Sequence, residues 1–217
     1  MSFKPLFTEA DLASIREATA TAELRTGGEI VPYIVERVVE VEQARWRGAA
    51  LGALAAALLA GLVHAFGGHW GGFGVGWITL PAVSGAGLGY LLAGLDTVAR
   101  RLIPEDELER AVGLRAEAAF LREEVFKTRD RTGILVFLAL FEHKAVILGD
   151  EGINRAVPEG AWQGLVDELV AGIRAGRAAE ALCGTIARCG EVLEAHRVAL
   201  RKDDEDELAD APRLRER

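Results

Sequence analysis

The sequence predicts an α/β domain that is interrupted by a transmembrane helical hairpin. Three observations lead to this fold class. No Asp, Glu, Lys or Arg occurs between Gly48 and Leu95, whereas the rest of the chain is densely charged. Outside that span, runs rich in β-branched residues alternate with segments of helical periodicity. The length of 217 residues suits one ordinary domain that carries an insertion.

The chain begins with a predicted helix and strand. Thr8 and Asp11 have the spacing of a capping box, so a helix is expected to start there and to stop at the Thr-Gly-Gly of residues 26–28. The following residues, EIVPYIVERVV, are typical of a strand. Pro32 within them restricts that strand to an edge, an end or a bulge.

The uncharged span divides into two apolar stretches, residues 48–66 and 77–95, with a glycine-rich turn between them. Each is close to the ~20 residues that a helix needs to cross about 30 Å of hydrocarbon. A buried helix of a soluble core normally keeps a polar stripe, and these stretches have none. The pattern therefore favours a membrane hairpin over a pair of core helices.

Basic residues flank the hairpin on one side only. Arg45 and Arg47 precede the first span, and Arg100 and Arg101 follow the second. The positive-inside rule then predicts that both termini face the cytoplasm and that the glycine-rich turn faces outward. Transport normally requires an ionisable group deep in the bilayer, so these spans are interpreted as an anchor in the lipid bilayer.

Small residues recur at every fourth position of both spans, and such stripes let helix backbones approach closely. They are expected to pack the hairpin on itself or on another protein. The residues are Ala49, Ala53, Ala57 and Gly61 in the first span and Gly85, Gly89 and Ala93 in the second.

Beyond the hairpin, a helix is predicted from Pro104 to about Thr128. Two strands at 134–141 and 145–148, joined by a short polar Glu-His-Lys, are expected to form an antiparallel β-hairpin. Two further helices follow, the first starting near Pro158. In the helix predicted from Pro104, the residues expected on the buried side are Leu108, Val112, Leu114, Ala118 and Leu121.

Composition excludes some functions. The chain has 33 acidic and 25 basic residues, a net charge of −8, and lacks the basic stripe that nucleic acid requires. Cys183 and Cys189 are too few for a disulfide framework and are expected to be reduced structural thiols. The mixed charges of residues 199–217 indicate a disordered tail, or alternatively an adaptor for a basic partner.

The predicted elements resemble those of the TPM domain family. The resemblance rests on TEADLASIREATATAELRTGGEIV, RTGILVFLALFEHKAVILGDEGINRAVPEGAW and AGIRAGRAAEALCGTIARCGEVLEAH. It covers nearly all of residues 6–198 apart from the hairpin. Within the family the chain is similar to a bacterial membrane-protein branch with a two-helix insertion after the first strand, which implies the bacterial inner membrane as its location.

The resemblance implies an α/β/α sandwich around a mixed sheet. The expected organisation is a first part of that domain at 1–45, the transmembrane hairpin at 46–99, a second part at 100–198 and the charged tail at 199–217. Some TPM domains bind calcium, one from a plant has been assigned acid phosphatase activity, and others assist membrane receptors or photosystem repair.

These roles suggest one candidate metal site. Asp150 and Glu151 follow the third predicted strand and Glu29 opens the first, so the three carboxylates form a possible calcium cluster. The alternative is that Asp150 caps the following turn and that Glu151 is solvated.

Two functions follow from the sequence. The first is a non-enzymatic binding or assembly module for a membrane protein complex, and the second is a metal-dependent, phosphatase-like hydrolase. Phosphatase signals are poor, because Arg188 follows Cys183 one position short of a Cys-x5-Arg phosphate cradle. His143 and His196 have no evident nucleophile beside them in the sequence.

Overall fold

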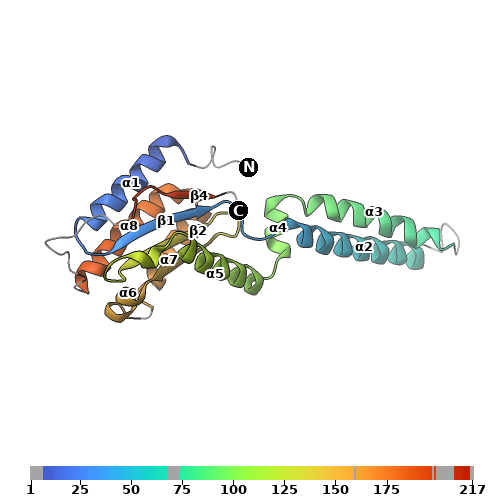
Figure 1. Cartoon of the computed structure of the whole chain (residues 1–217). Helices are drawn as coiled ribbons and strands as arrows, with labels where there is room; N and C mark the ends of the chain where they lie inside the picture. The colour runs from blue at the N-terminus through green and yellow to red at the C-terminus, as the bar shows by residue number, and fades with distance from the viewer. Residues whose placement is uncertain (1–6, 68–73, 159, 197, 199–207, 216–217) are drawn as a thin grey trace. The chain divides into compact units, whose positions relative to one another are not determined.

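A computed structural model describes residues 7–67, 74–158, 160–196, 198 and 208–215. The chain forms two compact units (Figure 1). One unit comprises Met1–Val38 and Glu109–Arg217, and it is called the α/β unit here. The other, Val39–Leu108, is called the hairpin unit.

The α/β unit is built on a mixed sheet of four strands in the order β3-β2-β1-β4. Strand β1 is parallel to β2 and β4, whereas β2 and β3 are antiparallel. The elements of this unit are α1 (Glu9–Glu23), β1 (Glu29–Val35), α5 (Glu105–Arg122, which begins in the hairpin unit), the 3-10 turn η1 (Val125–Lys127), β2 (Gly133–Ala139), β3 (Lys144–Gly149), α6 (Glu151–Ala156), α7 (Gln163–Arg174), α8 (Ala178–Ala195) and β4 (Arg213–Arg215). The predicted mixed α/β class is therefore confirmed.

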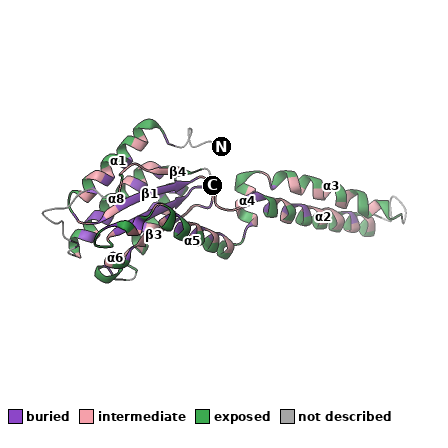
Figure 2. Ribbon diagram, viewed as in Figure 1, coloured by how far each residue is buried: buried purple, intermediate pink, exposed green. Residues whose placement is uncertain are grey.

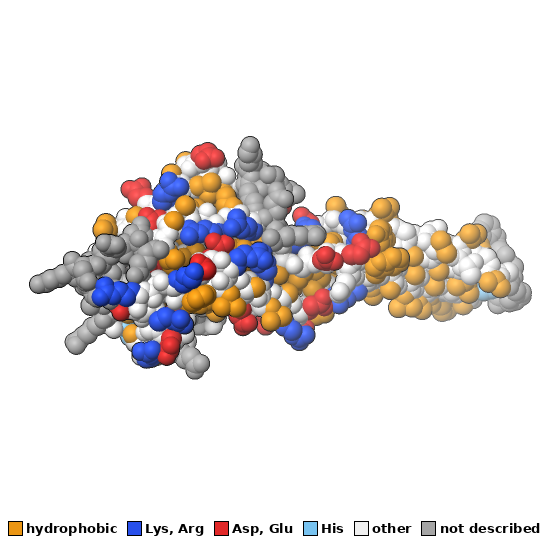
Figure 3. All heavy atoms as spheres, viewed as in Figure 1, with side chains coloured by type: hydrophobic (Ala, Val, Ile, Leu, Met, Phe, Trp, Pro, Cys, Tyr) orange, Lys and Arg blue, Asp and Glu red, His pale blue; other side chains and the backbone are white. Residues whose placement is uncertain are grey.

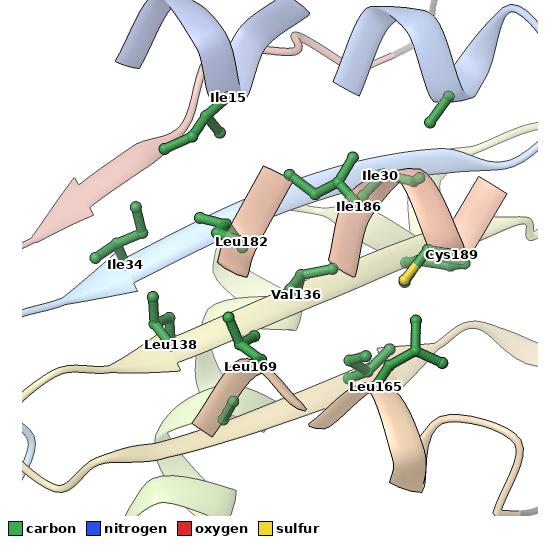
Figure 4. Close-up of a cluster of buried hydrophobic side chains, with 14 of the residues drawn as sticks. Ile15, Ile30, Ile34, Val136, Leu138, Leu165, Leu169, Leu182, Ile186 and Cys189 are labelled. Atoms are coloured by element: carbon green, nitrogen blue, oxygen red, sulfur yellow. The ribbon is translucent and has the colours of Figure 1, made fainter. Parts of the chain in front are cut away.

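Helices α1, α7 and α8 cover one face of the sheet (Figure 4). Ile30 and Ile34 of β1 point into this layer, where they meet Ile15 of α1 and Leu182 of α8. All four side chains are buried. The alternation of apolar side chains along β1 thus supplies one core on this face, and its other residues face the opposite side.

Helix α5 covers the other face. Its buried residues there are Val112, Ala116 and Ala119, which pack near the stacked rings of Tyr33 and Phe137. The ring centroids of that pair are 5.4 Å apart. Alanine at these positions lets the helix lie close to large aromatic side chains, so the small residues, rather than the leucines, face the sheet.

The predicted buried side of this helix is partly wrong. Leu108 and Val112 are buried as expected, but Leu114 and Leu121 are 62% and 64% exposed, and Ala118 is also exposed. The predicted and observed sets share Leu108 and Val112 and differ further along the helix, where Ala116 and Ala119 are buried in place of the predicted leucines. Spacing alone therefore identified the helix without identifying which stripe meets the sheet.

Several local predictions are confirmed. Thr8 Oγ1 accepts a hydrogen bond from the Asp11 backbone N at 3.1 Å, and the Asp11 carboxylate accepts one from the Thr8 backbone N at 2.8 Å, which completes the capping box. Strands β2 and β3 form the expected antiparallel hairpin. His143 in their connection has φ +51°, as a tight turn requires.

Pro32 lies at a position that tolerates its missing N–H. Among the described residues, strand β4 pairs only with residues 33–35 of β1, so there Pro32 has a neighbouring strand on the β2 side alone. The sequence restricted this strand to an edge, an end or a bulge, whereas β1 is an interior strand whose pairing with β4 begins one residue after Pro32.

The predicted disordered tail over 199–217 is wrong for residues 208–215. Within this segment β4 pairs in parallel with β1, and Arg213 and Arg215 both contact the carboxylate of Glu123 at 3.3 and 3.1 Å. Leu208 packs with the core under α5. Strand pairing and two ion pairs therefore order a sequence that has few apolar residues of its own; residues 199–207 and 216–217 lie outside the described residues.

The described residues of the hairpin unit form α2 (Val41–Phe66), α3 (Gly76–Leu92), α4 (Asp96–Leu102) and the first turn of α5. Helices α2 and α3 pack side by side along their length (Figure 1). The predicted stretch 48–66 is helical throughout, and the stretch 77–95 is helical as far as Leu92. Most of the glycine-rich turn between them, residues 68–73, lies outside the described residues.

Candidate functional site

The two long helices of the hairpin unit meet through glycine. A Cβ built on Gly52 would lie 2.1 Å from the Gly85 carbonyl oxygen, and one on Gly89 would lie 2.1 Å from that of Gly48. Real Cβ atoms do not approach a backbone oxygen this closely. Only glycine permits this separation of the two helices, which is the purpose of small residues in membrane helix pairs.

The structure corrects one of the two predicted small-residue stripes. On α3 the contact uses Gly85, Gly89 and Ala93, as expected. On α2 it uses Gly48, Gly52 and Ala56, one position before the predicted Ala49, Ala53 and Ala57. Helix α2 has two adjacent stripes with a small residue at every fourth position. Only the packing against α3 decides which of the two stripes forms the contact.

The outer surface of this helix pair is apolar and exposed (Figure 2). Figure 3 shows orange apolar side chains along it, whereas the blue and red charges lie on other parts of the view. The exposed large side chains are Leu51, Leu54, Leu58, Leu59, Leu62, Val63 and Phe66 on α2 and Ile78, Leu80, Val83, Leu88, Leu91 and Leu92 on α3. A monomer in water rarely exposes a continuous apolar surface of this extent.

Helix α2 is long and apolar enough to cross a membrane, with a mean hydropathy of 2.0 over its most apolar window. Helix α3 has 17 residues, and the chain bends by 108° between α3 and α4. These two helices are long and apolar enough to form a second span only if they are counted as one broken span. The described part of the chain thus contains one such helix, or two with the bent pair.

Aromatic and charged side chains gather at one end of the helix pair. Trp46 and Tyr90 are in edge-to-face contact with centroids 5.5 Å apart, and the Arg45 guanidinium lies 5.7 Å from the centre of the Tyr90 ring. Arg47 pairs with Glu107 at 2.8 Å. From residue 46 to His64, near the other end, the helical rise gives about 27 Å, close to the ~30 Å of a bilayer core.

The carboxylate of Asp150, the first predicted metal ligand, already binds two groups of the protein. Its side chain caps α6 by accepting a hydrogen bond from the Glu151 backbone N at 2.7 Å. Its other oxygen lies 2.8 Å from Arg131 Nε. Glu151 is exposed and pairs with Arg155 at 2.8 Å. The capping alternative describes this loop, and an arginine balances the buried charge.

Glu29, the third predicted ligand, belongs to a different acidic group. It lies at the start of β1, where its carboxylate accepts a hydrogen bond from the Leu208 backbone N at 3.3 Å. Glu23, the last residue of α1, accepts one from the Ile30 backbone N at 2.6 Å. The Glu23 side chain is also hydrogen-bonded to Asp210. Three carboxyl groups from distant parts of the chain therefore come together here.

Burial is the main reason why the pKa of Glu23 rises to about 9, and the Glu29 charge and Asp210 raise it further against the opposing hydrogen bond from Ile30. Glu23 is therefore protonated at neutral pH and can donate its proton to Asp210. Sequence reasoning missed this group, because Asp210 lies 187 positions from Glu23 in the segment predicted to be disordered. The Glu23–Glu29 spacing around Thr-Gly-Gly was the one local signal.

The three predicted ligands are not gathered into one metal site. Among the residues that the structure describes, no three His, Cys, Asp or Glu side chains form a group that could hold a metal ion. Calcium coordination takes six to eight oxygens, which Asp150, Glu151 and Glu29 do not assemble.

The two cysteines are free, as predicted, and neither has the character of a nucleophile. Burial raises the pKa of Cys189 to about 12 and also raises that of Cys183. Arg188 forms an ion pair with Glu168 on α7. His196 Nδ1 lies 2.8 Å from the Val192 carbonyl oxygen. These contacts do not favour the phosphatase hypothesis.

A cavity of about 1040 Å³ opens along β3 of the α/β unit. It is bounded by α7 and by the start of the α5 segment of this unit, and it lies at the edge of the sheet. Its volume is at the upper end of the roughly 300–1,000 Å³ of usual ligand pockets. Its lining includes Val112, Lys144, Val146, Val166, Val170 and Arg174.

Comparison with known proteins supports the fold. No protein-family model matches the chain, and no curated protein matches it. Its structure is similar to the NMR structure of BA42 protein from the psychrophilic bacterium Bizionia argentinensis, with a TM-score of 0.59 and 19% sequence identity. The similarity covers 98% of each chain. At this identity it shows a shared fold alone.

Proposed function

We propose that this protein is a membrane-anchored binding or assembly module of a membrane protein complex, built on a TPM-like α/β/α sandwich. The observation that carries the proposal is the exposed apolar surface of α2 and α3, which has no formal charge from Gly48 to Leu95. Lipid is the solvent in which such a surface is stable.

The placement of basic residues supports the proposed orientation. Arg45 and Arg47 lie at the start of α2, and Arg100 and Arg101 lie in α4 beyond α3. With two spans, the hairpin holds the α/β unit on the cytoplasmic side of a bacterial inner membrane. The aromatic pair of Trp46 and Tyr90 then lies at the cytoplasmic interface.

Cysteine labelling in intact cells tests the anchor. In a Cys183→Ser background the remaining Cys189 is buried. A membrane-impermeant maleimide is expected to label Gly74→Cys from outside and to leave Gly164→Cys unlabelled until the cells are lysed. Both positions leave open space for an added side chain. Labelling of Gly164→Cys alone in intact cells would reverse the orientation, and extraction of the protein by carbonate would refute the anchor.

Cross-linking in membranes tests the binding role. Lysine-reactive cross-linking before solubilisation is expected to link the full-length chain to one membrane protein in stoichiometric amounts. Recovery of the monomer alone would leave an anchored domain without the proposed assembly role.

A further inference from the structure

The cavity of the α/β unit lies where the sheet has an open edge. Strand β3 is the last strand of the order β3-β2-β1-β4, and β2 pairs with it on one side. Within the described ranges, no strand pairs with its other side. An edge strand directs backbone N–H and C=O groups of alternate residues outward, where another strand can pair with them.

Two helices line the cavity on either side of this edge. Val166 and Val170 of α7 form an apolar wall on one side of the sheet, and Glu109 and the buried Val112 of α5 line the other. Val146 of β3 lies between them and is only half-buried. Since successive side chains of a strand point to opposite faces, an added strand would place alternate side chains against α7 and against α5.

The cavity lining carries four charged residues, Glu109, Lys144, Asp167 and Arg174. Lys144, the first residue of β3, pairs with Glu109 at 2.9 Å. Arg174 is the last residue of α7, and its neighbours Ile173 and Gly176 line a smaller cavity with His143, so this end of α7 lies beside the start of β3. Lys144 and its partner Glu109 thus lie at the same end as Arg174, whereas Asp167, about two helical turns before Arg174, accepts a hydrogen bond from Gln163.

We propose that the groove binds an extended peptide of a partner protein, which adds to the sheet antiparallel to β3 and carries a carboxylate at its C-terminal end. Antiparallel pairing brings that end to the start of β3, where Arg174 and Lys144 provide the complementary charge. The inference rests on the proposed binding role and names the chemistry of its partner.

Selection from a peptide library tests this site. Full-length protein in detergent micelles is exposed to random hexapeptides displayed with free C-termini, and the most enriched peptide is synthesised with a fluorophore. The enriched peptides are expected to have apolar residues at alternate positions and a carboxylate at the C-terminal end. That carboxylate belongs either to an acidic side chain or to the free C-terminus. Amidation of the peptide distinguishes these two sources.

Charge reversal provides the matched variants. Arg174→Glu is expected to weaken binding of the selected peptide by about tenfold, because it places a carboxylate beside the peptide carboxylate. Arg155→Glu is the control, since Arg155 is an exposed arginine on α6 outside the cavity lining. Its peptide affinity is expected to equal that of the wild type.

Backbone methylation tests strand addition itself. N-methylation of peptide amides that face β3 is expected to abolish binding, whereas methylation of the intervening amides leaves it intact. Hydrogen exchange of residues 144–149 is expected to slow when the peptide binds. A peptide that merely fills an apolar hole would tolerate both sets of methyl groups, which would overturn strand addition.

Other outcomes also refute the proposal. They are a library without enriched sequences, binding that Arg174→Glu does not change, and protection of β3 that depends on protein concentration without peptide, which would indicate pairing with a second copy. Stoichiometric membrane cross-linking that persists in Arg174→Glu would retain the proposed function and eliminate this groove as its site.

Discussion

Gly52 and Gly85 face each other so closely that a Cβ on either residue would lie 2.1 or 2.3 Å from the carbonyl oxygen of the other. The contact is reciprocal and involves backbone on both sides, so no side-chain rotation can relieve an added methyl group. The helix pair therefore depends on these glycines.

We expect Gly52→Ala to destabilise the hairpin. The added methyl group has to push α3 away, a steric cost of about 1–3 kcal/mol, although alanine favours the helix by roughly 1 kcal/mol. Gly87→Ala, which meets open space, is the control and is expected to be neutral or stabilising. Melting in detergent measures both. Equal melting temperatures for the two variants would contradict the close contact.

Glu23 makes the stability of the α/β unit depend on pH. Its folded pKa of about 9 exceeds the ordinary 4.5, so the folded chain binds this proton more tightly than the unfolded chain does. The contribution is complete below about pH 4.5 and is lost as the pH rises through about 9. Stability is thus expected to fall across this window.

Glu23→Gln is expected to remove that dependence. Glutamine retains an oxygen for the Ile30 N–H and can donate to Asp210, but it does not ionise. The variant should melt above the wild type near pH 9 and match it near pH 5, as the linkage relation predicts. Glu17→Gln, on the exposed side of α1, is the control. Its melting temperature should change between pH 5 and pH 9 by as much as that of the wild type. Parallel melting curves for Glu23→Gln and wild type across this range would show that Glu23 is ionised.

Glu123 is expected to hold the C-terminal strand in place. It accepts both Arg213 and Arg215, and Arg213 is only 17% exposed, so Glu123→Gln should weaken the docking of β4 by about 1–3 kcal/mol. Hydrogen exchange of residues 213–215 should accelerate accordingly. Glu124→Gln, which breaks an exposed pair with Lys127, is the comparison and should leave that exchange unchanged.

Calcium is expected to have no effect through Asp150. Asn can replace the cap on α6, so Asp150→Asn should lose only the pair with the half-exposed Arg131, about 1 kcal/mol or less. The melting temperature of both proteins should be the same with and without excess calcium. A calcium-induced rise that appears in the wild type and disappears in Asp150→Asn would restore the metal site.

Much of the fold follows from local signals. The charge-free run and the helical periodicity around it locate α2 and α3, because hydrophobic helices are recognised without knowledge of their neighbours. The capping box at Thr8 and the Glu-His-Lys connection before β3 are equally local. The candidate metal residues were less predictable, since Asp150 is neutralised by Arg131 and Glu29 joins Glu23 and Asp210, partners that sequence proximity does not reveal.

The sequence by itself determined the order of the long helices and of the first three strands, the apolar hairpin and the free thiols, since each depends on composition or on neighbours within a few residues. Tertiary structure alone decided that Gly52 rather than Ala53 meets α3 and that Ala116 rather than Leu114 meets the sheet. It also made a strand of Arg213–Arg215. The physical reason is the same in each case: periodic spacing leaves the rotation of a helix and the pairing of a strand open, and only a partner distant in the chain selects one.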